Sequence, residues 1–299
     1  MKTVLVTGGT GFIGIPLVKA LMASGYRVTV LTRNPDRARQ KLPDEAGVIT
    51  ELKALDAIPD VMVNLAGEPL AARRWSVETK AFIRDSRIGF TNKLFDFFER
   101  KGKFPARVIS GSAIGYYGNC GDLLLDEQVP AGTDFAAQLC LDWELSARQF
   151  EQRGSSLCVL RTGIVLGING GALKQMLPAF RWVMGGLMGS GEQYMSWIHI
   201  DDMVRLILFV IDHPVITGPI NAVSPQSVIN RDFSHILAGV LRRPALLPMP
   251  ALVLRLLFGE MADTVLLASQ RVLPRRAIDG GFEFHYPDLK GALDNLLIQ

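Results

Sequence analysis

Short runs of apolar, mostly β-branched residues alternate along this chain with longer segments whose apolar residues recur with the period of a helix. The short runs are typical of buried strands and the longer segments of amphipathic helices. The predicted strands read TVLVTG, YRVTVLT, DVMVNLAG, ARVISGS and SLCVLRTG. Helices are predicted over about 12–24, 77–101 and 135–153, and a glycine follows each of them. This alternation favours an α/β fold with a doubly wound parallel sheet, the Rossmann arrangement.

The long predicted helix over 77–101 carries an apolar stripe, which we expect to pack in the core. The stripe consists of Phe82, Ile83, Phe90, Leu94, Phe97 and Phe98. Core packing explains these aromatic residues better than a ligand role does.

The texture of the sequence changes beyond Gly167. The segments GINGGALKQM and MGGLMGSGEQ are rich in glycine, and the C-terminal part has prolines at positions 244, 248, 250, 274 and 287. We therefore expect a Rossmann domain over 1–166, with its sheet completed by 195–224. Residues 167–194 and 225–299 would form a smaller C-terminal substrate lobe.

Composition sets limits on the class of protein. A chain of 299 residues with 48% hydrophobic content can bury a sizeable core in one two-lobed unit or two small domains. Its 32 basic and 29 acidic residues are scattered and leave a net charge of +3, so nucleic acid is not an expected partner. Cys120, Cys140 and Cys158 form no CxxC pair, which argues against disulfides and a zinc site.

Targeting and membrane signals are not expected either. The apolar run in MKTVLVTGG is too short for the core of a signal peptide. The most apolar segments, LILFVI and ALVLRLLFG, are far shorter than the roughly 20 residues of a spanning helix, and the second contains Arg255. We expect a cytoplasmic protein without a membrane partner.

The first predicted strand leads directly into TGGTGFIG and then into a helix. Glycine fits a tight turn, lets backbone N–H groups approach a pyrophosphate, and allows close packing of helix on strand. The helix N-terminus adds partial positive charge. The sequence thus predicts dinucleotide binding rather than a purely structural turn, at Gly8, Thr10, Gly11, Phe12, Ile13 and Gly14.

The second predicted strand ends in LTRNPDRARQ, where an NAD enzyme would place an acidic residue for the ribose 2′-hydroxyl. Here Thr32 and Arg33 occupy the strand end. A guanidinium can pair with the 2′-phosphate of NADP, and no acid stands at this strand end to repel that phosphate. The alternative is a solvated surface arginine.

Several segments together resemble the extended short-chain dehydrogenase/reductase family: TGGTGFIG, NLAGE, SGSAIGYYG, RTGIVLG and WIHIDDMVR. The segments NLAGEPLAARRW and LPMPALVLRLLFGEMADTVLLASQRVLPRRAIDGGFEF resemble an NAD-dependent epimerase/dehydratase-like subgroup often labelled "epimerase family" protein. The resemblance implies that Leu65, Ala66 and Gly67 pass along the adenosine and ribose. It also implies that Val165 lies at the nicotinamide end, although Leu65 and Ala66 are also explained by core packing.

The family's chemistry uses a tyrosine and a lysine four residues apart on one helix, where the lysine lowers the pKa of the tyrosine. Aligning Glu144 with the glutamate that commonly follows this pair places Ala136 and Cys140 at the two positions, so the pair is missing. Tyr116 and Tyr117 lack a lysine four residues on, and the resemblance implies that they line the substrate cleft. A catalytic Cys140 is less expected than an inert buried thiol.

Two residues are candidates to take over part of this chemistry. The resemblance implies that Ser112 polarises the substrate, with Ser110 as the alternative register. Arg87 stands where the family often has an asparagine, and its charge could replace that of the missing lysine on ribose or phosphate oxygens. A surface arginine is the alternative.

Other residues receive less specific expectations. His199 is expected to join the two lobes rather than act as a base. Glu68, Arg73, Arg74 and Trp75 would lie over the substrate cleft and bind an anionic or sugar-like ligand, or form a solvated loop. No cluster of metal-ligating residues stands out.

Taken together, the sequence predicts an NADP(H)-binding oxidoreductase or epimerase-like enzyme that acts on a small polar substrate. Because no proton donor is identified, a non-catalytic NADP(H) sensor or scaffold is the alternative. By the same resemblance, the helices beginning near 77 and 135 would form the interface of a homodimer.

Overall fold

The computed structural model describes residues 1–70, 74–245 and 247–298. A seven-stranded sheet with the order β11-β7-β5-β4-β1-β2-β3 forms its centre, and every pairing within it is parallel. Its strands are β1 (Thr3–Thr7), β2 (Arg27–Leu31), β3 (Gly47–Ile49), β4 (Val61–Asn64), β5 (Arg107–Ala113), β7 (Ser156–Thr162) and β11 (Gly218–Ala222). The order reverses between β1 and β4, where a doubly wound sheet binds its ligands.

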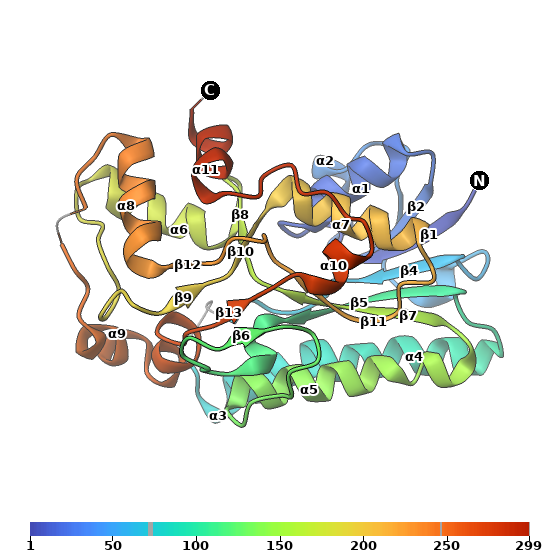
Figure 1. The fold of residues 1–299 in the computed structure, drawn as a ribbon. Coiled ribbons are helices and arrows are strands. Elements are labelled where there is room, and N and C mark those ends of the chain that lie inside the picture. The colour runs from blue at the N-terminus through green and yellow to red at the C-terminus, as the bar shows by residue number, and fades with distance from the viewer. Residues whose placement is uncertain (71–73, 246, 299) are drawn as a thin grey trace.

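Helices cover both faces of this sheet (Figure 1). One face packs against α1 (Gly14–Ala23), α2 (Pro35–Lys41) and α7 (Ile200–Asp212), and the other against α4 (Phe90–Lys101) and α5 (Phe135–Arg148). The strands therefore have buried side chains on both faces, which explains why they read as continuous apolar runs. The predicted α/β fold with a doubly wound parallel sheet is confirmed.

The long predicted helix over 77–101 is not continuous. It consists of α3 (Val77–Arg84), a π-helical turn η2 (Asp85–Gly89) and α4. The expected stripe holds for Ile83, Leu94 and the two phenylalanines of α4 that are buried. It is wrong for Phe82, which is 52% exposed, because adjacent helical positions point about 100° apart and Ile83 takes the inward one.

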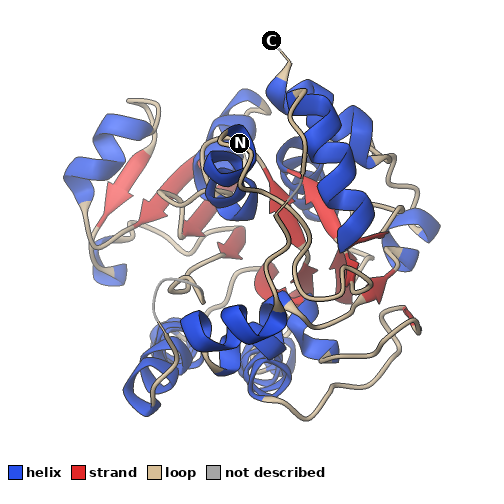
Figure 2. Cartoon of the chain, turned by 90° about the vertical axis from the view of Figure 1, so that its left-hand side faces the viewer, coloured by secondary structure: helices blue, strands red, loops and turns tan. Residues whose placement is uncertain are grey.

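The C-terminal lobe has a second core in which helices pack against short strands, and Figure 2 shows helices flanking strands. The helices of this core are α6 (Gly171–Arg181), α8 (Asn230–Leu241) and α11 (Leu289–Leu297), while α9 (Ala251–Phe258) contributes no residue to it and α10 (Arg275–Asp279) packs in the core of the main sheet. Three two-stranded ladders stand apart from the seven-stranded sheet: β8 (Ile164–Leu166) with β10 (Trp197–His199), β9 (Tyr194–Met195) with β12 (Val228–Ile229), and β6 (Leu124–Leu125) with β13 (Arg271–Val272). Within the described ranges, no helix has the length and apolar character to cross a bilayer.

Candidate functional site

The glycine loop between β1 and α1 is packed backbone against backbone. Gly8 has a φ of +70°, and a Cβ placed on it would lie 2.7 Å from the carbonyl oxygen of Leu65. A Cβ on Gly14 would lie 2.2 Å from the carbonyl oxygen of Gly8. Only glycine fits both positions. Among the described residues no side chain caps α1, so its first N–H groups can receive an anion.

The ring of Phe12 points out of this loop toward the segment that follows β8. A Cβ on Gly170 would lie 2.7 Å from the Phe12 ring, and a Cβ on Gly171 would lie 2.9 Å from the same ring and 2.8 Å from the carbonyl oxygen of Val165. This close contact explains why glycines stand at positions 170 and 171. The contact also places the carbonyl of Val165 near the Phe12 ring.

The loop after β4 lies between the glycine loop and the π-helical turn. Leu65 donates its N–H to the Thr7 carbonyl at 3.2 Å. A Cβ on Gly67 would lie 3.1 Å from Cζ of Arg87. Nη2 of Arg87 donates to the Glu68 carbonyl at 2.9 Å, and the guanidinium stacks on Trp143 at 5.2 Å. Burial lowers the pKa of Arg87. Arg87 therefore faces the site and is not a solvated surface residue.

Arg33 at the end of β2 pairs with the carboxylate of Glu68 at 2.7 Å. The sequence has no acid at this strand end, but the fold brings Glu68 there from the loop after β4, so the expectation of a site without a repelling acid is wrong. The side chain of Arg33 is 87% exposed. It can therefore exchange this carboxylate for another anion at little cost. Thr32 accepts the N–H of Asn34 at 3.2 Å, which shapes the turn beside it.

The two positions of the missing tyrosine and lysine are filled by packing. Ala136 and Cys140 are both buried on α5, beneath the short helix η3 (Ile114–Tyr117). A Cβ on Gly115 would lie 3.5 Å from that of Ala136 and 3.9 Å from the Cys140 sulfur. Burial raises the pKa of Cys140 to about 12, so the thiol stays protonated and unreactive near neutral pH.

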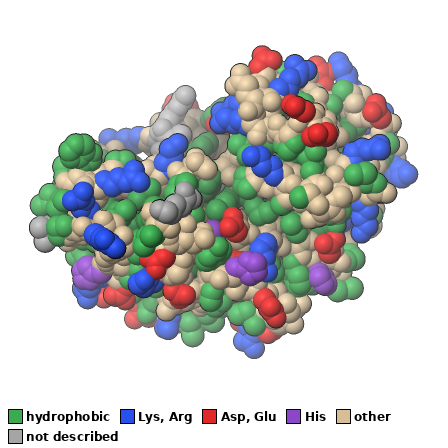
Figure 3. All heavy atoms as spheres, turned by 90° about the horizontal axis from the view of Figure 1, so that it is seen from above, with side chains coloured by type: hydrophobic (Ala, Val, Ile, Leu, Met, Phe, Trp, Pro, Cys, Tyr) green, Lys and Arg blue, Asp and Glu red, His purple; other side chains and the backbone are tan. Residues whose placement is uncertain are grey.

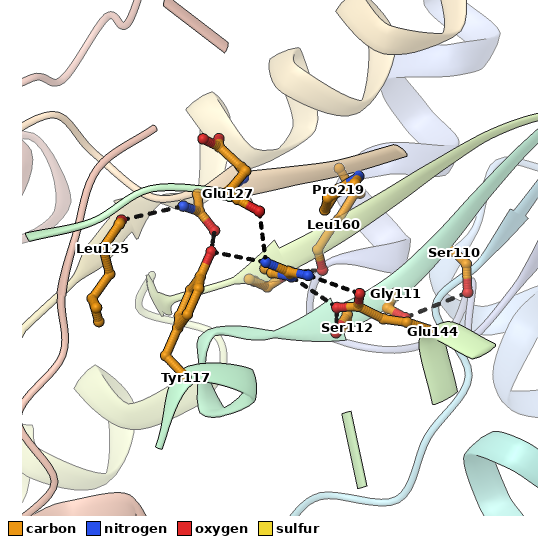
Figure 4. A network of polar contacts seen from close by, with 12 residues as sticks. Ser110, Gly111, Ser112, Tyr117, Leu125, Glu127, Glu144, Leu160 and Pro219 are labelled. Carbon is orange, nitrogen blue, oxygen red and sulfur yellow. Dashed lines mark hydrogen bonds and ion pairs between the residues drawn. The ribbon is translucent and has the colours of Figure 1, made fainter. Parts of the chain in front are cut away.

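Ser112, at the end of β5, belongs to a buried network around the ion pair of Arg161 and Glu144 (Figure 4). Its hydroxyl donates to Oε1 of Glu144 at 2.8 Å, and Arg161 donates to both carboxylate oxygens at 2.9 and 3.0 Å. An ionised carboxylate only accepts hydrogen bonds, so the proton of Ser112 is committed to Glu144. While the pair is intact, that proton is not available to polarise a substrate carbonyl. Ser110, the alternative, is buried too.

Tyr117 reaches the same network from η3. Its hydroxyl donates to Oδ1 of Asn221 at 2.7 Å and accepts from Nη1 of Arg161 at 3.1 Å. The Tyr116 ring packs on the guanidinium of Arg161 at 3.4 Å. Burial raises the pKa of Tyr117 to about 12. The expectation that these tyrosines line a cleft is wrong, because both are buried and turn toward the charge of Arg161 instead.

His199 has a structural position, as expected. Its ring stacks on Tyr286 of the C-terminal lobe at 3.9 Å, and Nδ1 accepts the N–H of Asp201 at the start of α7. Burial lowers the pKa of His199, so the neutral form that accepts this hydrogen bond is favoured. The residue joins the two lobes and caps a helix.

The loop before α3, which was expected to lie over the cleft, is held by a cluster of side chains that the sequence did not indicate. Trp75 packs edge-on against Phe135 at 5.0 Å, and Lys80 lies 4.7 Å above the Phe135 ring. Lys80 also pairs with Glu260, which is 180 residues away along the chain. No local pattern could have revealed a partner at that distance. Arg73 lies outside the described residues.

Comparison with known proteins agrees with this geometry. Residues 4–222 match the model of the NAD dependent epimerase/dehydratase family, and residues 249–296 match a domain of unknown function, DUF1731. An epimerase family protein of Arabidopsis thaliana, SDR39U1 homolog, chloroplastic, is 41% identical over 97% of this chain and 85% of its own length. Epimerase family protein Mb2239 of Mycobacterium bovis is 39% identical over 97% of this chain and 96% of its own.

A solved structure extends the likeness to the coordinates. The crystal structure of human epimerase family protein SDR39U1 (isoform2) with NADPH has a TM-score of 0.89 and 33% identity, and the match covers 98% of both chains. With the doubly wound sheet, the glycine loop and the matched family model in agreement, the chain is an atypical extended short-chain dehydrogenase/reductase that belongs to the NAD dependent epimerase/dehydratase family.

Proposed function

We propose that this protein binds NADP(H) along the carboxyl edge of its parallel sheet. The observation that carries the proposal is the close backbone contact between Gly8 and Leu65 at the uncapped N-terminus of α1. This arrangement presents N–H groups to a pyrophosphate at the point where the strand order reverses. The human relative crystallised with NADPH supports the same nucleotide for this chain.

The nucleotide would extend across three segments. The pyrophosphate would lie on the backbone of the glycine loop, formed by Gly8, Thr10, Gly11, Phe12, Ile13 and Gly14. Leu65, Ala66 and Gly67 would follow the adenosine and ribose, while Arg87 and Val165 would meet the nicotinamide end. Phe12 would contribute through its N–H only, because its ring packs on Gly170.

Arg33 would recognise the 2′-phosphate beside Thr32. A bound phosphate would draw the guanidinium away from Glu68, since a dianion attracts it more strongly than one carboxylate does. The freed Glu68 would then oppose the phosphate. Glu68 therefore limits the preference for NADP(H), and with NAD(H) it could accept a ribose hydroxyl instead.

Two uses of the bound nucleotide are supported by different observations. A sensor or scaffold role is favoured by the lack of a usable acid: Tyr117 and Cys140 are buried with pKa values of about 12, and the proton of Ser112 is held by Glu144. An oxidoreductase or epimerase-like reaction on a small polar substrate is favoured by Arg87. Its buried charge beside Gly67 could stabilise negative charge that develops during hydride transfer.

Calorimetry with NADPH, NADP, NADH and NAD tests the binding proposal, and equal affinity for all four would contradict the role of Arg33. A screen of sugar nucleotides and small carbonyl compounds, in which the nicotinamide absorbance is followed, distinguishes an enzyme from a sensor. Turnover that Arg87→Ala abolishes supports the enzyme. Tight NADP(H) binding without turnover on any compound supports the sensor.

Assembly and location stay predictions. A homodimer through α3, α4 and α5 would cover the exposed side chains of Phe82 and Leu145 on that face. Light scattering on wild type and on Phe82→Ser would test it, and an unchanged monomeric mass would contradict it. Cytoplasmic location is likewise an expectation, and the word chloroplastic belongs to the Arabidopsis relative.

A further inference from the structure

The C-terminal lobe carries an exposed apolar surface that neither the fold nor the nucleotide site uses. The helix α9 buries only Leu254 and leaves most of its leucines exposed. We call this region the α9 surface, and it consists of Trp182, Met184, Leu247, Met249, Leu252, Val253, Leu256 and Leu257. Trp182 is 76% exposed and Leu256 is 67% exposed. Monomeric soluble proteins rarely leave so many large apolar side chains together in water.

The α9 surface is assembled from two segments that are distant in sequence. The N–H of Met249 donates to the Leu187 carbonyl at 2.8 Å, and the N–H of Gly189 donates to the Met249 carbonyl at 2.9 Å. A Cβ on Gly186 would lie 2.3 Å from the Leu247 carbonyl oxygen. The chain after α6 therefore runs beside the chain that leads into α9, which brings Trp182 and Met184 into the neighbourhood of the exposed leucines.

The two segments that form the α9 surface carry positive charges and no negative ones. Residues 163–191 and 233–259 contain no aspartate or glutamate. Their cations are Lys174, Arg181, Arg242, Arg243 and Arg255. Of these, only Arg255 forms an ion pair with a described residue, Asp263. Figure 3 shows Lys and Arg side chains at both ends of the molecule, with Asp and Glu side chains among them.

This combination points to an occupant that is both flat and anionic. A second copy docking on the same surface would bring like charges together, because Arg181, Arg242 and Arg243 flank its apolar residues along the chain, and this opposes association. A bilayer with anionic headgroups would attract the arginines while it accepts leucine and tryptophan side chains at the interface. Such contact needs no spanning helix, so it is compatible with the lack of one in the described ranges.

We propose that the α9 surface docks this protein on the surface of an anionic phospholipid bilayer. The expectation of no membrane partner rested on the short apolar segments, which cannot span a bilayer but can lie on its surface. The end of α9 also lies beside α3, since Glu260 follows α9 and pairs with Lys80. The proposal does not depend on nucleotide binding.

Co-sedimentation with vesicles tests it. Wild type is expected to bind vesicles of equal parts phosphatidylglycerol and phosphatidylcholine at low salt, to bind pure phosphatidylcholine far less, and to be released by high salt. The pair Leu256→Ser and Leu257→Ser should lower partitioning by at least about tenfold. The pair Arg242→Gln and Arg243→Gln should lower it by about 25-fold, or about fivefold for each cation.

Matched controls separate docking from general charge and from misfolding. Val215→Ser removes an apolar side chain that is 86% exposed elsewhere, and Lys103→Gln removes a distant cation; both should bind vesicles like wild type. Circular dichroism should show equal melting temperatures throughout. A blue shift of tryptophan fluorescence on vesicle binding should disappear in Trp182→Phe.

Three results would overturn the proposal. The first is wild type that stays in the supernatant with anionic vesicles at low salt. The second is vesicle binding that survives the serine pair, which would show that charge alone drives it. The third is a wild-type dimer in light scattering that the serine pair dissociates while vesicle binding is absent, because a second copy would then cover the α9 surface.

Discussion

At the scale of single residues, the proposed preference for NADP(H) would depend on the competition for Arg33 between Glu68 and a 2′-phosphate. Arg33→Ala should weaken NADP(H) binding by about 10- to 100-fold, since one charge-assisted hydrogen bond is lost, and leave NAD(H) binding nearly unchanged. Glu68→Gln should strengthen NADP(H) binding several-fold, because it removes a negative charge next to the phosphate. Calorimetry measures both, and a Glu68→Gln protein with weakened NADP(H) binding would show that the carboxylate contacts the ligand.

Tyr117 offers a second test at this scale. Tyr117→Phe deletes a hydroxyl that satisfies both Asn221 and Arg161, and it leaves those two buried groups without that partner. The free energy of unfolding should fall by about 1–3 kcal/mol, while any turnover should change by less than about tenfold. Urea denaturation gives the first quantity. Loss of turnover with unchanged stability would instead make the phenol a proton donor.

At the scale of elements, two turns shape the proposed nucleotide site. The glycine loop lets β1 and the loop after β4 approach within backbone contact, and the π-helical turn between α3 and α4 carries Arg87 toward Gly67. Turns of this π type often occur at functional sites. The sequence predicted the glycine loop directly, because its chemistry is local. It did not predict the π-helical turn, whose single extra residue leaves no clear mark on the helical period.

A substitution at Gly11 can distinguish an effect on nucleotide binding from an effect on folding. The N–H of Gly11 donates to the Gly8 carbonyl at 2.9 Å, and a Cβ would lie 3.0 Å from that oxygen, so a side chain is tight but tolerated with a small shift. Gly11→Val should abolish nucleotide binding in a protein with a wild-type dichroism spectrum. Gly239→Ala, on α8, where a Cβ would meet nothing within 4 Å, is the control and should bind normally. Retained binding in Gly11→Val would mean that the loop serves only the fold.

At the scale of the whole molecule, buried charges tie the lobe to the sheet. Oε1 of Glu127 accepts the N–H groups of Asn221, on β11, and Arg276, on α10. Its Oε2 is buried without a hydrogen-bond partner among the described residues. Burial raises the pKa of Glu127. The folded protein therefore holds this proton more tightly than the unfolded chain does.

Because proton binding by Glu127 is coupled to folding, the stability of the protein depends on pH. Because the folded pKa of Glu127 lies above its unfolded value, its contribution to stability is fully present below the unfolded pKa. It is lost as pH rises toward the folded one. Glu127→Gln, which cannot ionise, should flatten the fall in stability from about pH 4 upward. Denaturation across this range measures the difference, and parallel curves for the two proteins would contradict the assignment.

The features whose physics is local could be predicted from the sequence. Strands and helices follow from the apolar period and the glycine loop from turn chemistry, while the resemblance to the family showed that Ala136 and Cys140 stand at the positions of the tyrosine and lysine. The strands, the helices and the glycine loop each depend on residues within one or two turns of chain. The short edge strand β3 and the break in the long helix were missed, since three residues or one inserted residue give too little signal.

Which distant groups meet follows from the tertiary structure. Glu68 reaches Arg33, Glu144 accepts the hydrogen bond of Ser112, and Tyr117 turns inward to Arg161, because the strand order brings these segments together. The apolar residues of the α9 surface likewise come together only once the chain after α6 runs beside the chain leading into α9. Such pairings follow from the free energy of burying charge and apolar area across the whole chain, which no local pattern encodes.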